Sequence, residues 1–256
     1  MGQRMVKLCL TDFGGSGAKP TLVLLHGLLG TARNMTMIAR AFTETRRVIG
    51  LDMRNHGSSP WESTHQYREL ACDVAETLMD EVGHFDLLGH SMGGKAAMIG
   101  VLEEILKPRK LIVGDIAPVS YDHSQLPAID AMLSADLTQF DRRMPLAKSL
   151  GATLGDPAMG QFLAQAAEFT EAPRWVHNLA LLREEMGAIV GFPETSAKSN
   201  IDCLFVGGRK SHYIEEAAVL HHFPNAQIEW IEGAGHWVHA EAPQEFNALV
   251  RTFLDP

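Results

Sequence analysis

Short apolar runs recur along the chain, and each is followed by a segment with helical periodicity or by a turn-rich loop. The runs comprise residues 21–25, 48–52, 85–88, 111–114, 203–206 and 228–231. Apolar runs without regular polar alternation are typical of parallel strands that are buried on both faces. The pattern therefore predicts an α/β fold, a mostly parallel sheet with helices on both faces.

Helical periodicity is clearest in residues 67–81, where Leu70, Val74 and Leu78 recur every four positions. A second helix is expected over residues 243–254, at the end of the chain. The opening stretch, residues 6–13, precedes a glycine-rich turn and is interpreted as an antiparallel edge strand.

The alternation of strand and helix stops after Pro118 and resumes near Ile201. The intervening segment has no convincing strand, but it has four helix candidates, residues 127–133, 144–151, 160–169 and 174–186. We expect residues 1–117 and 197–256 to form the core and residues 118–196 to form an inserted helical cap. A lid that walls a pocket is favoured over a decorative insertion, because both ends of the segment emerge where sheet strands finish.

The amino-acid composition excludes several classes of protein. The 256 residues are 46% hydrophobic and 21% charged, which indicates a globular chain with one large domain, or one domain with an insertion. The net charge of −9 disfavours a nucleic acid partner, because phosphate binding needs clustered cations. No secretory signal and no membrane span is apparent, so we expect a cytoplasmic enzyme without a membrane partner. The three cysteines are widely spread and suggest neither a disulfide framework nor a zinc site.

The strongest chemical signal is the G-x-S-x-G pattern at residues 89–93, between an apolar strand and a helix-like segment. A serine on a sharp turn from strand to helix needs neighbours without bulky side chains, and Gly89 and Gly93 meet that need. The helix that follows brings free N–H groups close to the serine, which favours an anionic intermediate. Ser91 is therefore the candidate nucleophile.

A serine hydroxyl attacks only when a base removes its proton, so a histidine must reach the same end of the sheet. His236 lies in a glycine-bearing loop just after the last predicted strand, which is where such a base should lie. His239, three residues later, is the main competitor, and we expect it to be partly buried. His236 is the candidate base.

The orienting acid has two candidates. Asp115 follows the apolar run 111–114 directly, at its carboxyl end, whereas Asp202 precedes the run 203–206 and so stands at the wrong end. The alternative for Asp115 is a turn cap, because aspartate commonly binds free backbone N–H groups there. We assign Asp115 the role of holding the imidazole in the correct tautomer.

An oxyanion hole needs two N–H donors, and Met92, the residue after the serine, supplies one. The other is expected from Leu28, in the glycine-bearing loop after residues 21–25. His26 in that loop is interpreted as bonding the loop backbone rather than a metal. The polar run 52–59 is interpreted as a structural loop in which Asp52 and Arg54 hold backbone near the site.

Together, the segments 24–27, 52–59, 89–93 and 233–237 resemble the α/β-hydrolase superfamily over nearly the whole chain. Within it, residues 114–118 and 174–179 are similar to the small YbfF-type esterases. The superfamily commonly places its acid after the penultimate strand, where this chain has Ser211. In YbfF-type members the resemblance implies an acid after the preceding core strand, in agreement with Asp115. It also implies hydrolysis of short or medium acyl esters or thioesters without a metal or organic cofactor.

The sequence thus predicts a serine esterase that acts on a small-molecule ester and forms an acyl-enzyme. Leu29, Trp237 and the cap residue Trp175 are expected to line the acyl pocket. Three alternatives stay open: a hydrolase of carbon–carbon bonds, lactones or peptides, an acyltransferase or perhydrolase, and a receptor without catalysis. The natural substrate and the oligomeric state are left open as well.

Overall fold

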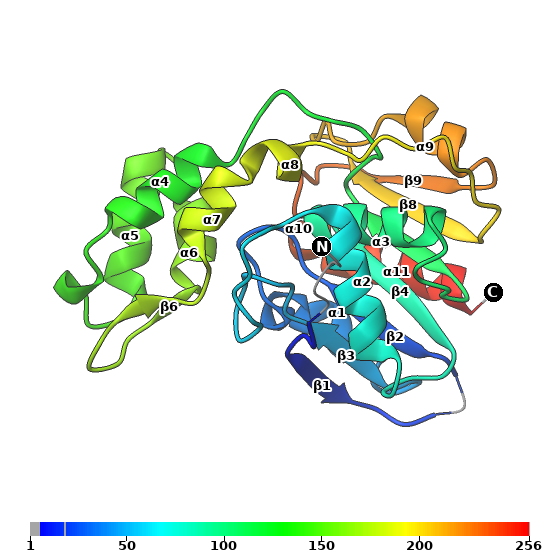
Figure 1. The fold of residues 1–256 in the computed structure, drawn as a ribbon, viewed down its shortest axis with the longest axis horizontal. Helices are drawn as coiled ribbons and strands as arrows, with labels where there is room; N and C mark the ends of the chain where they lie inside the picture. Colours follow the sequence, from blue (N-terminus) through cyan, green and yellow to red (C-terminus); the bar gives the residue numbers. More distant parts are fainter. Residues whose placement is uncertain (1–5, 18, 256) are drawn as a thin grey trace.

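All six predicted apolar runs lie in one sheet of the computed structural model, which describes residues 6–17 and 19–255 (Figure 1). Within these ranges the sheet has seven strands in the order β1-β3-β2-β4-β5-β8-β9. Strand β1 is antiparallel to β3, and all the other neighbouring pairs are parallel. The strands are β1 (Leu10–Gly14), β2 (Thr21–Leu25), β3 (Val48–Leu51), β4 (Phe85–His90), β5 (Leu111–Gly114), β8 (Cys203–Gly208) and β9 (Gln227–Ile231).

Alternate side chains of each strand enter two different hydrophobic clusters, because successive residues of a strand point to opposite faces. Val23 and Leu25 of β2 pack with helices of one face, while Leu22 and Leu24 pack with those of the other. The first face is covered by α2 (Tyr67–Leu78), α3 (Met92–Leu102) and α9 (Glu216–His222), and the second by η1 (Ala32–Met35), α1 (Thr36–Phe42), α10 (Val238–Glu241) and α11 (Pro243–Leu254). The predicted α/β class with helices on both faces is confirmed.

Between β5 and β8 the chain forms a separate helical lobe beside the sheet (Figure 1). The lobe has its own cluster of buried apolar side chains, which includes Ile129, Leu146, Leu163 and Leu182. Its elements are α4 (Leu126–Ser134), η2 (Leu137–Gln139), α5 (Arg143–Leu154), α6 (Pro157–Ala164), β6 (Ala167–Glu168), β7 (Arg174–Trp175), α7 (Leu179–Glu184) and α8 (Met186–Val190). Among the described residues, no helix has the length and apolarity that a membrane crossing requires.

The helical lobe differs from the sequence prediction in one place. Residues 160–169 and 174–186 were expected to be helical throughout, but α6 ends at Ala164 and α7 begins at Leu179. Between them, β6 and β7 pair in antiparallel register, Ala167 opposite Trp175. Two-residue strands have no room for the alternation that identifies a strand, so the helix-like spacing of nearby apolar residues was misleading.

A buried lysine ties the sheet region to the end of this lobe. Lys95 of α3 is 1% exposed, and its Nζ donates hydrogen bonds to the carbonyls of Val190 (2.8 Å) and Gly191 (2.6 Å), where α8 ends. The same ammonium lies over the Tyr121 ring, 4.6 Å from its centroid. Burial lowers the pKa of Lys95 to about 7. These contacts fasten the end of the lobe to α3.

The six consecutive parallel strands β3-β2-β4-β5-β8-β9 direct their carboxyl ends to one edge of the sheet. Loops from several strands meet at that edge, which is where open α/β sheets bind ligands. The loops after β2, β4, β5 and β9 carry all three predicted triad residues and both predicted oxyanion donors.

Candidate active site

Ser91 lies on the sharp turn between β4 and α3, in a backbone conformation that side-chain-bearing residues rarely adopt, with φ +51° and ψ −118°. The turn closes because two glycines allow close backbone approach. A Cβ on Gly93 would lie 2.5 Å from the carbonyl oxygen of Leu25, and one on Gly89 would meet the carbonyl of Gly93. The backbone therefore has the strained geometry predicted for a projecting serine.

The three predicted residues of the triad form one continuous hydrogen-bonded row. His236 Nε2 lies 3.1 Å from Ser91 Oγ, and His236 Nδ1 lies 2.7 Å from Asp115 Oδ2. With Nδ1–H donating to the carboxylate, Nε2 carries the lone pair that accepts the serine proton. The structure thus brings together three side chains from three different loops.

Asp115 is fully buried directly after β5, with φ +47°. Its second oxygen, Oδ1, accepts a hydrogen bond from the Gly208 amide at 3.0 Å, and the Ser211 hydroxyl donates to Oδ2. Asp202 precedes β8, at the opposite edge of the sheet, where its carbonyl accepts from the Leu111 amide. Asp115 is therefore the candidate acid that reaches His236. Ser211 stands where the superfamily commonly has its acid, and it donates a hydrogen bond to the Asp115 carboxylate.

Tyr213 and His90 also contact His236, and neither was predicted from the sequence to do so. The Tyr213 ring stacks on the imidazole with centroids 4.0 Å apart and planes 27° from parallel. His90 Nε2–H donates to the His236 carbonyl at 2.9 Å. Burial, reinforced by His239 and His236, lowers the pKa of His90 well below its usual value, so this ring is neutral. Both residues restrict the loop that carries the base.

The competing base, His239, lies inside α10 and is buried more completely than predicted, with 6% of its surface exposed. Its ring packs edge-on against His90, at 4.4 Å between centroids. Burial lowers its pKa to about 4. The structure therefore places His236, rather than His239, at the serine.

Both predicted oxyanion donors lie close to Ser91, among the residues that line the same cavity. Met92 opens α3, and Leu28 follows Gly27, where an added Cβ would lie 3.3 Å from the Ser91 Cβ. Among the described residues, neither the Leu28 nor the Met92 amide donates a hydrogen bond to another protein group. Free N–H groups beside a nucleophile suit a developing negative charge.

The loops around the site are held as the sequence predicted. His26 Nδ1–H donates to the Gly27 carbonyl at 2.8 Å, and its Nε2 accepts from the Met53 amide at 2.9 Å. The Asp52 carboxylate accepts from the amides of Ala32 and Ser58. Arg54 forms a buried ion pair with Asp73, with Nε and Oδ2 2.6 Å apart. These polar groups hold the backbone near Ser91.

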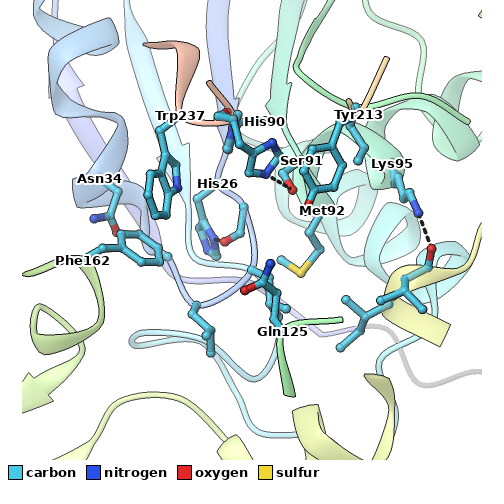
Figure 2. Close-up of a pocket in the computed structure, with 18 of the residues that line it drawn as sticks. His26, Asn34, His90, Ser91, Met92, Lys95, Gln125, Phe162, Tyr213 and Trp237 are labelled. Carbon is cyan, nitrogen blue, oxygen red and sulfur yellow. Dashed lines mark hydrogen bonds between the residues drawn. The ribbon is translucent and has the colours of Figure 1, made fainter. Parts of the chain in front are cut away.

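A largely apolar cavity of about 290 Å³ opens over Ser91 (Figure 2). It is lined by Leu28, Leu29, Met92 and Trp237, together with side chains of the helical lobe. The ring centroids of Phe162, which belongs to that lobe, and Trp237 are 5.5 Å apart. Trp175 was expected here, but the structure places it elsewhere. Because β7 pairs with β6, Trp175 packs instead against the apolar cluster of the lobe.

In the part of the chain that the structure describes, no group of three or more His, Cys, Asp or Glu side chains is arranged so that it could hold a metal ion. Cys9 and Cys72 are half-buried, Cys203 is buried, and none forms a disulfide within those ranges. Burial raises the pKa of Cys203 to about 12, so its thiol stays protonated.

The chain is similar to several known proteins over most of its length. It is 33% identical to sn-1-specific diacylglycerol lipase ABHD11 of Xenopus laevis (98% of this chain, 85% of the relative) and 34% identical to esterase YbfF of Escherichia coli strain K12 (91% and 92%). A solved structure described as a marine microorganism esterase superposes with a TM-score of 0.89 at 31% identity, covering 97% of this chain and 99% of that one. The sequence profile of the alpha/beta hydrolase family matches residues 22–249, so this chain belongs to that family.

Proposed function

We propose that this protein is a serine carboxylesterase in which Ser91 is the nucleophile, His236 the base and Asp115 the orienting acid. Relatives named esterase and lipase bear out the coarser expectation of a carboxylesterase-type hydrolase. The observation that carries the finer proposal is the unbroken row from the Asp115 carboxylate through the imidazole to the Ser91 hydroxyl. This row activates an otherwise weak nucleophile.

In the first half-reaction, Ser91 Oγ attacks the carbonyl carbon of the ester while its proton passes to His236 Nε2. Asp115 stabilises the imidazolium that forms. The tetrahedral intermediate collapses when the bond to the alcohol oxygen breaks, and His236 returns the proton to the leaving alkoxide. An acyl group then remains on Ser91, and the alcohol has left.

In the second half-reaction, His236 takes a proton from a water molecule, whose oxygen attacks the acyl carbon. Collapse of this second intermediate breaks the bond to Ser91 Oγ, which regains the proton from His236. The carboxylic acid is released, and the resting enzyme is restored. In both intermediates the free amides of Leu28 and Met92 bind the oxyanion, each contributing about 3 kcal/mol.

We propose that residues 118–196 act as a cap that walls the acyl pocket. Phe162, Met186 and Ile189, all from this segment, line the cavity over Ser91. Apolar walls favour an alkyl chain, and the cavity of about 290 Å³ favours a short or medium one. Leu29 and Trp237 form part of the same wall.

The proposal is tested by hydrolysis of a p-nitrophenyl ester series from acetyl to palmitoyl, together with an acyl-CoA thioester, a diacylglycerol, a lactone and a peptide amide. We expect kcat/KM to be highest for a short or medium acyl chain and to fall for palmitoyl. In Ser91→Ala, turnover should fall by about 10⁶-fold, as when a serine triad loses its nucleophile. Circular dichroism should show an unchanged fold.

Retained activity in Ser91→Ala near the wild-type level would remove the proposed nucleophile. Preference for the lactone or the amide would transfer the assignment to another hydrolase class. Repeating the assay with added alcohol separates hydrolysis from acyl transfer, because both pass through the same acyl-enzyme and differ only in the acceptor. We expect the free acid to remain the main product.

A further inference from the structure

Four buried histidines, one of them in the candidate oxyanion loop, lie together beside the site, and the mechanism above uses none of them. The rings of His26, His65 and His177 surround that of His56, with centroid distances of 5.2, 5.4 and 4.9 Å. At most 1% of each residue is exposed. Because burying polar side chains is costly, such a cluster calls for a specific structural or catalytic reason.

Two of these rings hold the two backbone groups of a single residue, Leu29. The Leu29 amide donates to His56 Nε2 at 3.2 Å, and the Leu29 carbonyl accepts from His177 Nε2 at 2.9 Å. Leu29 has a φ of +60°, which costs free energy for a residue with a side chain. The two imidazoles therefore fix a strained residue next to Leu28, the candidate oxyanion donor.

The hydrogen bonds of the second nitrogen in each ring indicate that both imidazoles are neutral. His56 accepts the Leu29 N–H at Nε2 and so carries its proton on Nδ1, which donates to the Arg54 carbonyl at 2.9 Å. His177 donates from Nε2, and its Nδ1 accepts from the Gly57 amide at 3.3 Å. Each ring thus bridges one donor and one acceptor. Burial is the main reason that the pKa of each is lowered, to about 3 for His177.

His177 also links the loop to the lobe between β5 and β8, because it lies between β7 and α7. Its neighbour Asn178 donates its amide N–H to the Asn55 carbonyl at 2.9 Å, and its side chain donates to Asn55 Oδ1 at 3.1 Å. Two consecutive lobe residues are therefore fastened to the loops that follow β2 and β3. The lobe is bonded directly to the backbone that carries the candidate oxyanion donor.

We propose that His56 and His177 are positioning residues, which clamp Leu29 so that the Leu28 amide stays aimed at the oxyanion. Through His177, the strength of the oxyanion hole depends on the placement of the lobe. This inference rests on the proposed function, since it takes Leu28 as an oxyanion donor. It assigns the two histidines a role in kcat rather than in substrate binding.

The test exploits the two nitrogens of His177. In His177→Gln the side-chain amide reaches the position of Nε2 and can still donate to the Leu29 carbonyl. In His177→Asn the shorter amide reaches only the position of Nδ1, so the bond to Gly57 is kept and the bond to Leu29 is lost. Removing an oxyanion donor outright costs about 10²- to 10³-fold, so misplacing one in His177→Asn should lower kcat by about 10- to 100-fold.

With a p-nitrophenyl butyrate assay we expect KM of His177→Asn to stay within about two-fold of wild type, because ground-state binding is unaffected. His177→Gln should keep kcat within about three-fold. The pair His56→Gln and His56→Asn provides an independent version of this test. Glutamine Oε1 can accept the hydrogen bond from the Leu29 N–H, whereas the shorter asparagine side chain cannot reach it. His222→Ala is the control for losing a buried histidine and its bond to a backbone carbonyl, because His222 Nδ1 bonds the Ala197 carbonyl and His222 does not line the cavity.

Loss of kcat in both asparagine variants, with recovery in both glutamine variants, supports the clamp. Equal loss in asparagine and glutamine variants, or a loss confined to KM, overturns it in favour of a packing role. Unchanged kcat in the asparagine variants also overturns it. A parallel Ser91→Ala assay separates the two proposals: if that variant is inactive while the histidine variants are normal, the clamp alone fails.

Discussion

At the scale of single residues, the location of the proposed acid is the feature of the site that departs from the common superfamily arrangement. Asp115 follows β5, and the Ser211 hydroxyl after β8 donates to the same oxygen that His236 Nδ1 contacts. Position 211, where the superfamily commonly has its acid, thus lies beside the proposed carboxylate. Both positions can direct a carboxylate oxygen toward the same imidazole nitrogen.

Asp115→Asn should lower kcat for ester hydrolysis by about 10²- to 10⁴-fold, because an amide facing Nδ1 favours the wrong tautomer of His236. The substitution Ser211→Asp, added to Asp115→Asn, should recover at least about ten-fold, since the new carboxylate lies next to the lost one. Steady-state kinetics on folded protein measure both effects.

Asp202→Asn is the control for this pair, because Asp202 is exposed at the other edge of the sheet. Its kcat should stay close to that of wild type, because its carboxylate lies at the edge of the sheet opposite Ser91. A larger loss in Asp202→Asn than in Asp115→Asn would show that the acid is assigned to the wrong residue.

The sequence identified those residues whose chemistry follows from a strand end or a known turn. It did not identify Tyr213, His56 or His177 as neighbours of the site, because their contacts join loops that are far apart along the chain. Trp175 was predicted to line the pocket as an aromatic residue of the cap, and its place in β7 directs it elsewhere. Loop-to-loop contacts have no periodic signal in a sequence.

At the scale of elements, the buried strands were the most predictable part of the fold. Residues 21–25 and 111–114 coincide with β2 and β5, because a strand covered on both faces must be apolar throughout. Strand β4 continues beyond its apolar run to His90, since pairing with Gly114 of β5 extends it toward Ser91. The short elements α1, α9 and α10 were not predicted, because one or two helical turns show little periodicity.

The loop between β3 and α2 shows how polar residues can be structural. The sequence favoured a structural loop over a phosphate or metal site, and Asp52 and Arg54 indeed bond backbone and buried carboxylates. What the sequence could not show is that this loop also receives His177 and Asn178 from the helical lobe. The loop therefore joins the sheet edge, the candidate oxyanion loop and the lobe.

At the scale of the whole molecule, the buried histidines make folding stability depend on acidity. Burial lowers the pKa of His65 and His177 to about 3, whereas in the unfolded chain a histidine titrates near about 6.5. The folded pKa is depressed, so the stability contributed by each neutral ring is fully present above about pH 6.5. It is lost progressively as the pH falls from about 6.5 toward 3, because the unfolded chain binds protons that the folded chain excludes.

His65→Gln should therefore reduce the pH dependence of the unfolding free energy between about pH 6 and 4.5 by about one proton, or 1.4 kcal/mol per pH unit. Urea unfolding at a series of pH values measures this slope. His84→Gln supplies the surface control, because His84 is exposed in the structure. An identical slope in wild type and His65→Gln would contradict burial of a neutral ring at position 65.

The central proposal is that Ser91 is the nucleophile that receives the acyl group. Its most direct test is the reaction of the folded protein with a fluorophosphonate probe, followed by mass spectrometry of the intact chain and its peptides. We expect one phosphonyl group per chain, on the peptide that contains Ser91, with esterase activity lost in proportion to labelling. Full esterase activity in protein whose Ser91 is not labelled, or labelling of a different serine, would contradict the account.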